Sequence, residues 1–356
     1  MTERAKFLIE KLCSEHSLEL SEYKELILAR DDEVAALLAE RAREVRQRHY
    51  GTGVYVRGLI EISNICKNDC LYCGIRRGNS EAERYRLTKE EILECCDEGY
   101  SLGFRTFVLQ GGEDPYYTDD VLCEILFEIK GRYPECAVTL SLGERSHDSY
   151  SRLFTAGADR YLLRHETACP VHYARLHPTD MSYDGRMRCL RDLKDIGYQV
   201  GCGFMVGSPY QTEDELAKDL KFIEEFSPNM CGIGPFIPHK KSVFAEHAAG
   251  SVELTCYLLS IIRLILPTVL LPATTALGTL AGDGRERGIL SGANVVMPNL
   301  SPHSVRTKYE LYNNKLHSGS ESAEALAELE SRLSKIGYHI EYSRGDQKDF
   351  FRKEGI

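Results

Sequence analysis

The sequence lacks the features that characterise several large classes of protein. Its 44 lysines and arginines are outnumbered by 54 aspartates and glutamates, which gives a formal net charge of −10. Nucleic-acid affinity depends on basic groups that neutralise phosphates, so this balance argues against an extended phosphate-binding surface. We therefore expect a small-molecule ligand and no nucleic acid.

Long apolar runs are also missing. The most apolar stretch, residues 254–271, is interrupted by Arg263 and Pro267 and does not predict a membrane-spanning helix. The first residues, Met1–Lys6, lack the apolar core and the cleavage site of a secretory signal. Together these absences predict a cytoplasmic protein that does not enter a membrane.

No low-complexity tract and no long linker rich in proline, glycine or serine divides the 356 residues, so a second independent domain is not expected. Apolar residues recur at helical spacing up to residue 49 and predict an N-terminal helical extension over 1–50. The barrel described next is expected over 51–319. Residues 320–356 read as a charged helix with a short polar end that packs on the barrel.

After Gly51 the chain alternates short apolar runs with amphipathic segments, as in successive βα units. Capping boxes at Thr88 with Glu91, and at Thr212 with Glu215, predict two helix starts. The eight expected strands are Val54–Ser63, Arg105–Gln110, Ala137–Leu142, Arg160–Glu166, Gln199–Val206, Met230–Ile237, Leu270–Ala276 and Asn294–Met297. Eight such units predict an α/β fold, a complete (β/α)8 TIM barrel, whose site lies at the carboxyl ends of the strands.

Thirteen cysteines occur, but only Cys66, Cys70 and Cys73 are clustered by spacing, directly after the first strand. Convergent thiolates bind soft metals or iron-sulfur clusters. A structural zinc site normally needs a fourth cysteine or histidine, and none follows before Cys95. A four-iron cluster with one open iron fits three ligands best, while zinc with a distant fourth ligand, or coincidence, remains open.

The spacing Cys-x-x-x-Cys-x-x-Cys, with Tyr72 before the last cysteine, resembles the motif of the radical S-adenosylmethionine (SAM) superfamily. That resemblance implies one 4Fe-4S cluster on the three cysteines and SAM on the open iron, where reductive cleavage gives a 5′-deoxyadenosyl radical. It also implies oxygen sensitivity and a low-potential electron donor, a ferredoxin or flavodoxin. The loop Gln110, Gly111, Gly112, Glu113 is similar to the family's glycine-rich segment at the methionyl amine.

Within the superfamily the pattern lies in the group of biotin synthase and 3-methylornithine synthase, and is closest to the HydE maturases of iron-iron hydrogenase. The segments that carry this resemblance include residues 84–88, 108–117, 139–144, 159–167, 232–239 and 272–276. The resemblance implies that SAM is also contacted by Ser141, Glu166, Arg186, Met205, Ile237 and Tyr309. It implies that an anionic substrate is bound by Thr139, Arg160, Thr274, Thr275 and Tyr312.

Purely structural roles for several of these residues remain open alternatives. Glu166 and Arg186 could simply pair with each other, and Thr274 and Thr275 could satisfy backbone groups. His165, on the opposite strand face to Glu166, reads as a structural histidine rather than a base.

A HydE-type role implies a small iron complex or other small molecule as substrate, with the HydG and HydF maturases as partners in H-cluster assembly. The last cysteine is Cys256, so no auxiliary C-terminal cluster is expected. Val108 and Thr139 stand where biotin synthase has cluster cysteines, which disfavours sulfur insertion. Two alternatives are a lysine mutase similar to 3-methylornithine synthase and, from another class, a non-catalytic metal-binding scaffold.

Overall fold

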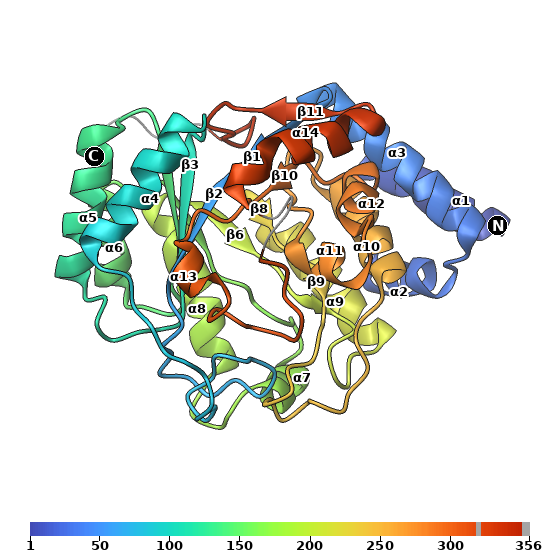
Figure 1. Ribbon diagram of the computed structural model, residues 1–356. Coiled ribbons are helices and arrows are strands. Elements are labelled where there is room, and N and C mark those ends of the chain that lie inside the picture. The colour runs from blue at the N-terminus through green and yellow to red at the C-terminus, as the bar shows by residue number, and fades with distance from the viewer. Residues whose placement is uncertain (318–321, 351–356) are drawn as a thin grey trace.

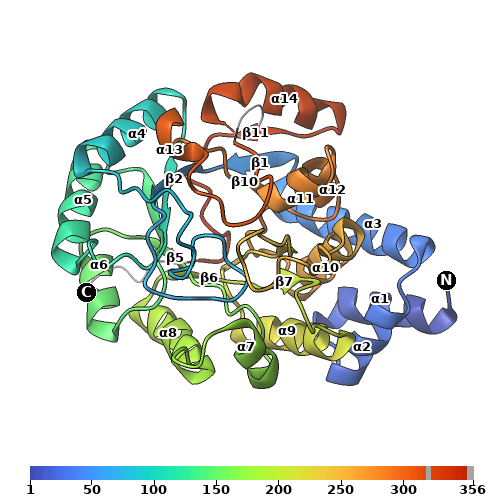
Figure 2. The same ribbon diagram turned by 60° about the horizontal axis from the view of Figure 1, so that its bottom comes forward.

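A six-stranded parallel sheet in the order β2-β3-β4-β5-β6-β8 forms the centre of the fold, and helices surround it (Figures 1 and 2). The computed structural model describes residues 1–317 and 322–350. The strands are β1 (Gly53–Val56), β2 (Gly58–Ser63), β3 (Thr106–Gly111), β4 (Ala137–Ser141), β5 (Arg160–Leu162), β6 (Gln199–Cys202), β7 (Met205–Val206), β8 (Met230–Cys231), β9 (Gly234–Pro235), β10 (Val295–Val296) and β11 (His339–Glu341).

The helices alternate with these strands. They are α1 (Glu3–Glu15), α2 (Leu20–Leu28), α3 (Asp32–Tyr50), α4 (Lys89–Ser101), α5 (Asp119–Arg132), α6 (His147–Thr155), α7 (Pro170–Leu176), α8 (Tyr183–Ile196), α9 (Glu213–Phe226), α10 (Val252–Ile265), α11 (Thr275–Leu280), α12 (Gly284–Leu290), α13 (His303–Arg306), the 3₁₀ turn η2 (Ala323–Ala325) and α14 (Leu326–Lys335). Both predicted capping boxes are formed, at the starts of α4 and α9.

Beyond the six-stranded sheet, single parallel bridges join Met230 to Leu270 and Pro272 to Val295. Strand β10 in turn pairs with β1, which leads directly into β2. The described residues therefore form an α/β fold with a curved, TIM-like parallel sheet.

Five of the eight expected strands differ from the prediction. The expected strand 54–63 divides at Arg57 into β1 and β2, which lie in different sheets, and the expected strand 160–166 ends as β5 at Leu162. The segment 199–206 divides into β6 and β7 at Gly203, whose φ of 149° suits glycine, and a Cβ there would lie 2.0 Å from the carbonyl oxygen of Gly232. The segment 230–237 divides similarly into β8 and β9. The expected strand 270–276 makes only single bridges, and its end becomes the start of α11 with Thr274 as N-cap.

The N-terminal helices cover one side of the fold. Helix α3 packs on α10, and α2 packs on α9 (Figure 2). Buried apolar residues of these helices, among them Leu8, Leu26 and Leu38, belong to the main core. The expected helical extension therefore packs on the outer helical layer.

The tail contains a strand that the sequence analysis did not anticipate. After η2 and α14, strand β11 pairs in parallel with β1. The residues that follow contact the amino-terminal ends of β3, β5 and β6. There the Asp346 carboxylate accepts hydrogen bonds from Arg160 at 2.6 Å and from Gln199 at 2.6 Å.

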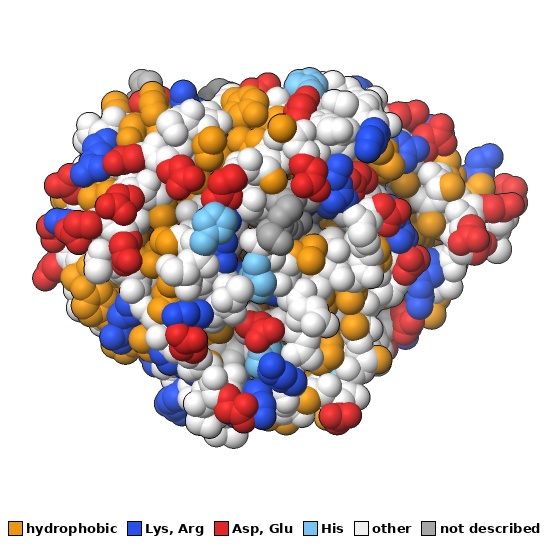
Figure 3. Space-filling model, in the orientation of Figure 1, with side chains coloured by type: hydrophobic (Ala, Val, Ile, Leu, Met, Phe, Trp, Pro, Cys, Tyr) orange, Lys and Arg blue, Asp and Glu red, His pale blue; other side chains and the backbone are white. Residues whose placement is uncertain are grey.

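The surface agrees with the acidic composition. On the face drawn in Figure 3, acidic and basic side chains are interspersed and no continuous basic stripe is visible. Across the described residues no helix is both long enough and apolar enough to cross a bilayer.

Candidate radical SAM site

The cysteine loop leaves the carboxyl end of β2 and is held by a dense set of hydrogen bonds. The Arg84 guanidinium donates to the carbonyl oxygens of residues 64, 75, 76 and 79, at 2.6–3.1 Å. Asp69 accepts from Arg76 and from the amide of Gly78, at 2.7 and 2.8 Å. Hydrogen bonds within residues 64–84 therefore hold the loop in one conformation. The sequence had assigned no role to Arg84.

The three predicted cysteines come together at this loop. Burial raises the pKa of the Cys66, Cys70 and Cys73 thiols, that of Cys73 to about 12, and the neighbouring cysteines raise those of Cys70 and Cys73 further. The Glu113 amide approaches Cys66 Sγ at 3.4 Å, and Met181 Sδ lies 3.6 Å from Cys70 Sγ. Such thiols stay protonated until a metal displaces their protons.

The described residues include no group of three or more His, Cys, Asp or Glu side chains arranged to hold a single metal ion. Three thiols that ligate three different irons of a cluster need not meet at one point, whereas zinc would require its ligands about 2.0–2.3 Å from one centre. The donor set therefore suits a multi-iron cluster better than zinc.

The glycine-rich loop lies directly against the cysteine loop. The amide of Gly112 donates to the Ser63 carbonyl at 3.0 Å. A Cβ on Gly112 would lie 2.3 Å from the carbonyl oxygen of Ile65 and 2.8 Å from Cys66 Cβ. Only a residue without a side chain fits this close approach, so the two predicted motifs depend on each other sterically.

The two polar neighbours of these glycines are already engaged. Gln110 donates to the Tyr309 hydroxyl at 3.4 Å. The Glu113 carboxylate accepts from the Glu144 amide at 3.0 Å and pairs with Lys67 at 3.1 Å. Glu113 therefore fixes the spacing between the β3–α5 and β4–α6 loops.

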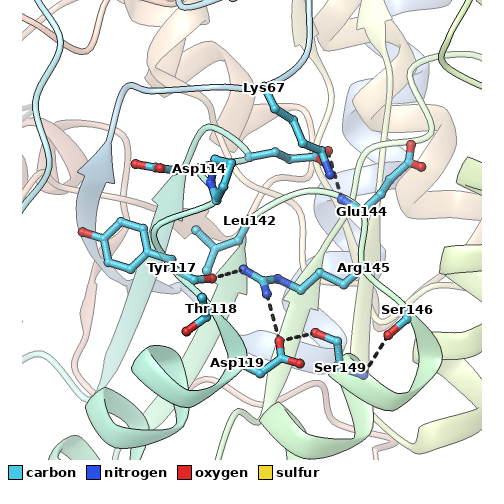
Figure 4. A pocket seen from close by; sticks show the side chains of 12 residues that line it. Lys67, Asp114, Tyr117, Thr118, Asp119, Leu142, Glu144, Arg145, Ser146 and Ser149 are labelled. Atoms are coloured by element: carbon cyan, nitrogen blue, oxygen red, sulfur yellow. Dashed lines mark hydrogen bonds and ion pairs between the residues drawn. The ribbon is translucent and has the colours of Figure 1, made fainter.

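These loops enclose a pocket of about 350 Å³ on the outer side of the glycine-rich segment. Figure 4 shows Lys67 reaching across its rim and Arg145 bonded to Asp119 and to the Tyr117 carbonyl. Acidic and basic groups both line it, and its charges are largely paired with one another.

Glu166 occupies a strained position at the barrel interior. Its φ is 65°, an uncommon value for a residue with a side chain. Its Oε2 atom is buried without a hydrogen-bond partner, although Arg164 Nη2 lies 3.3 Å away in poor hydrogen-bond geometry. A buried acceptor that lacks a donor is costly unless a ligand supplies one.

Arg186 does not pair with Glu166. Its Nε donates to Glu144 Oε1 at 2.7 Å, and its Nη1 donates to the carbonyl oxygen of Arg164. The two predicted SAM residues are therefore held separately. Glu144 is the partner of Arg186, and Arg164 lies beside Glu166; the sequence assigned a role to neither partner. The alternation of residues along a strand could have indicated Arg164, because it lies two residues before Glu166.

His165 packs against Phe222 and Asp219 of α9, which fits its interpretation as a structural histidine. Its Nδ1 accepts from the Gly203 amide at 3.2 Å, and its Nε2 lies 3.3 Å from Asp219 Oδ1. The same Asp219 oxygen accepts from the Ala168 amide at 2.5 Å. Burial raises the pKa of Asp219, and contact with His165 only partly opposes this. The pair therefore holds the backbone on both sides of Glu166.

The other predicted SAM residues surround the same region. Tyr72 lies edge-on to His177, with the Tyr72 hydroxyl 3.4 Å from Nε2. Burial lowers the pKa of His177 to about 3, so the ring is neutral, and its Nδ1 contacts the Tyr173 carbonyl. Ser141 ends β4, Met205 begins β7 and Ile237 follows β9, the last two being buried.

The predicted substrate residues fall into two groups. Thr139 Oγ1 and Thr274 Oγ1 are buried without a hydrogen-bond partner, as are Nε and Nη2 of Arg164. Thr275 begins α11, and Tyr312 lies in the segment after α13. Arg160, by contrast, lies at the amino end of β5, fully buried, with Nη2 on Asp346 and the Arg344 carbonyl and Nη1 on Thr106. Its guanidinium is thus already paired with a carboxylate of the chain.

The residues therefore fit the groups that the motif implies. Three thiols, a steric cradle at Gly112 and an unsatisfied carboxylate oxygen on Glu166 suit a cluster with SAM beside it. The unsatisfied hydroxyls of Thr139 and Thr274 suit a polar ligand.

Comparison with known proteins agrees with this geometry. The model of the radical SAM superfamily matches residues 60–223. The chain is 46% identical over 293 residues to the [FeFe] hydrogenase maturase subunit HydE of Thermotoga maritima, covering 82% of this chain and 83% of that protein. It is 29% identical over 289 residues to 3-methylornithine synthase of Methanosarcina acetivorans, covering 81% of each.

Two solved structures share the fold. Methylornithine synthase PylB superposes with a TM-score of 0.81 at 27% identity, covering 94% of this chain and 97% of that chain. The maturase HydG from Carboxydothermus hydrogenoformans gives a TM-score of 0.79 at 23% identity, with 98% and 82% covered, and at that identity shows the fold alone.

Proposed function

Because the chain belongs to the HydE family of the radical SAM superfamily, we propose that it is a maturase subunit that acts in assembly of the [FeFe] hydrogenase cofactor. It is a radical SAM enzyme, and its family implies a 4Fe-4S cluster and SAM. The observation that carries the assignment is the cysteine loop braced by Arg84 and packed against Gly112, at the carboxyl end of β2.

In this proposal Cys66, Cys70 and Cys73 hold the cluster. When bound, a cluster with one open iron supplies the coordination site and the electron for reductive cleavage of SAM. The three thiols must lose protons on binding, because burial raises their pKa values in the free protein. No further cluster is proposed at the C-terminal end, since the last cysteine is Cys256.

Glu166 and Arg186 would orient SAM. The Glu166 Oε2 atom needs a donor, which a ribose hydroxyl would supply. Arg186 is held in place by Glu144 and would pair with the methionyl carboxylate. The remaining contacts are proposed for Tyr72, Gln110, Gly111, Gly112, Glu113, Ser141, Met205, Ile237 and Tyr309.

Thr139, Thr274 and Arg164 would bind the substrate, with Thr275 and Tyr312 beside them. The unsatisfied hydroxyls of Thr139 and Thr274 favour a polar small molecule, such as a cysteine-bound iron complex delivered by HydG, with product passing toward HydF. Arg160 contributes to substrate binding only indirectly in this proposal, because its guanidinium is already paired with the Asp346 carboxylate.

We also infer that the parallel sheet closes into a complete eight-stranded barrel over residues 51–319. Support comes from the bridges at Met230–Leu270 and Pro272–Val295 and from the pairing of β10 with β1. At Pro272–Val295 a single bridge forms in place of a ladder because Pro272 cannot donate a backbone hydrogen bond.

The first test is SAM cleavage. After anaerobic reconstitution with iron and sulfide, dithionite plus SAM should yield 5′-deoxyadenosine, and the electron paramagnetic resonance signal of the reduced cluster should change when SAM is added. Cys70→Ala should abolish both, whereas Cys123→Ala, at a cysteine on α5, should leave both unchanged. Equal turnover by the wild type and Cys70→Ala would contradict the assignment.

The second test separates the maturase role from that of a lysine mutase. The protein should restore hydrogenase activity in a reconstituted maturation mixture that lacks only HydE, and Cys70→Ala should not. Conversion of lysine to methylornithine under the same conditions, without restored hydrogenase activity, would overturn the proposed role.

A further inference from the structure

The end of α7 holds the cysteine loop at two consecutive residues. The Leu71 amide donates to the Leu176 carbonyl at 3.0 Å, and the Tyr72 hydroxyl lies 3.4 Å from Nε2 of His177. The first contact fixes the backbone of the loop, and the second fixes a side chain. Both loop residues lie between the second and third predicted cluster ligands, so α7 acts on the part of the loop that joins two cysteines.

The hydrogen bonds of His177 determine the roles of its two ring nitrogens. Nδ1 lies 3.0 Å from the Tyr173 carbonyl oxygen, which can only accept, so Nδ1 carries the proton. Because the ring is neutral, Nε2 is an acceptor, and it lies beside the Tyr72 hydroxyl. Among the described residues, that hydroxyl has no other hydrogen-bond partner.

Ring contacts fix the orientation of the imidazole. The His177 ring stacks on that of Tyr173, with centroids 3.9 Å apart and 17° between the planes. It meets the Tyr72 ring edge-on, at 5.5 Å and 89°. His177 and Tyr173 are both buried. An imidazole packed in this way cannot rotate freely, so its Nε2 offers Tyr72 an acceptor in a fixed place.

The same row of side chains extends toward the other end of the proposed SAM site. The Arg186 guanidinium lies 6.0 Å from the centroid of the Tyr173 ring. Arg186 belongs to α8, which lies beside α7 (Figure 2). His177 and Tyr173 therefore lie between Tyr72 and Arg186, two residues that we propose contact SAM.

We propose that His177 is a positioning residue for SAM binding, which holds the Tyr72 ring through the Tyr72 hydroxyl in the orientation that receives SAM. This inference rests on the proposed function, because the contact of Tyr72 with SAM belongs to that proposal. His177 acts through Tyr72 and takes no part in the cleavage step. Its loss should therefore weaken the affinity for SAM and leave the maximal rate of cleavage nearly unchanged.

Two substitutions separate the two ring nitrogens. An asparagine amide reaches about as far as Nδ1, and a glutamine amide about as far as Nε2. His177→Asn thus keeps a donor for the Tyr173 carbonyl and loses the acceptor for Tyr72, whereas His177→Gln keeps the acceptor. The asparagine variant should bind SAM about 5-fold more weakly, the value of one hydrogen bond, and raise KM equally, with kcat within about two-fold of the wild type. The glutamine variant should bind SAM within about two-fold of the wild type, although it melts at a lower temperature.

Tyr72→Phe removes the same hydrogen bond from the other side. The double variant His177→Asn/Tyr72→Phe should bind SAM no more weakly than Tyr72→Phe alone, because both changes delete one interaction. Dissociation constants for SAM should be measured by anaerobic equilibrium dialysis with the reconstituted, oxidised protein, together with iron content and thermal melts. The matched control His49→Asn, at an exposed histidine of α3, should change none of these quantities.

A wild-type dissociation constant in His177→Asn would refute the positioning role. Equal losses of affinity in the asparagine and glutamine variants would also refute it, as would additive losses in the double variant. Failure of the wild type to cleave SAM with dithionite would instead refute the proposed function, and the dissociation constants would still decide the role of His177.

Discussion

Replacement of Gly112 by alanine should disable the site although it removes no functional group. The added Cβ would lie 2.3 Å from the Ile65 carbonyl oxygen and 2.8 Å from Cys66 Cβ. Ordinary van der Waals contact begins near 3.4 Å, so one of the two loops must move by about 1 Å. Overpacking of this kind costs about 1–3 kcal/mol.

The functional cost should exceed the loss of stability, because the displaced atoms carry a cluster ligand. A misplacement of about 1 Å at a reacting centre can lower the rate about 100-fold. We therefore expect Gly112→Ala to form 5′-deoxyadenosine about 100-fold more slowly and to hold less iron after reconstitution.

The matched control is Gly131→Ala on the exposed side of α5, where a Cβ would meet nothing within 4 Å. Alanine is favoured over glycine in a helix by about 0.5–1 kcal/mol, so this variant should melt at a higher temperature and keep full activity. Iron content, rates of SAM cleavage and thermal melts should be measured on both variants. Wild-type iron content and rate in Gly112→Ala would refute the steric argument.

Further predictions concern the barrel floor and Glu166. Asp346→Asn should lower the free energy of unfolding by about 3 kcal/mol, because it leaves Arg160 buried without its carboxylate partner, whereas the exposed Asp148→Asn should change it by less than about 0.5 kcal/mol. Burial raises the pKa of Asp346, but Arg160, Gln199 and Arg344 together outweigh burial and lower that pKa to about 2, below its ordinary value of 3.8. The difference between wild type and Asp346→Asn in urea titrations should accordingly be full at pH 6 and shrink below about pH 4; a difference independent of pH would contradict the ion-pair explanation. Asp219→Asn should raise the KM for SAM about 10-fold, with a smaller effect on kcat, because it loosens the backbone that holds Glu166; an unchanged KM would show that the aspartate does not position it.

The sequence predicted the order of the strands and the motif of three cysteines because both depend on local patterns. The periodicity of apolar residues located β3 and β4 to within one residue at each end. The 46% identity to HydE confirms the family indicated by the segments around those strands.

The remaining features depend on contacts between distant residues. Apolar composition alone could not show that β6 and β7 are separated at Gly203, where the chain passes against Gly232. The segment 270–276 has strand-forming residues, but its last two residues continue into α11. No local pattern around Arg160 indicated its pairing with Asp346, which lies 186 residues away in the sequence.

The contacts of residues 339–346 also have a consequence for folding during synthesis. Arg160 and Gln199 obtain their carboxylate partner, and β1 its neighbour β11, only when residues 339–346 have left the ribosome. Contacts of such high sequence separation form late, and until then a fully buried cation has no counter-charge. A chain that stops before residue 339 would therefore lack both the carboxylate partner of Arg160 and the strand that pairs with β1.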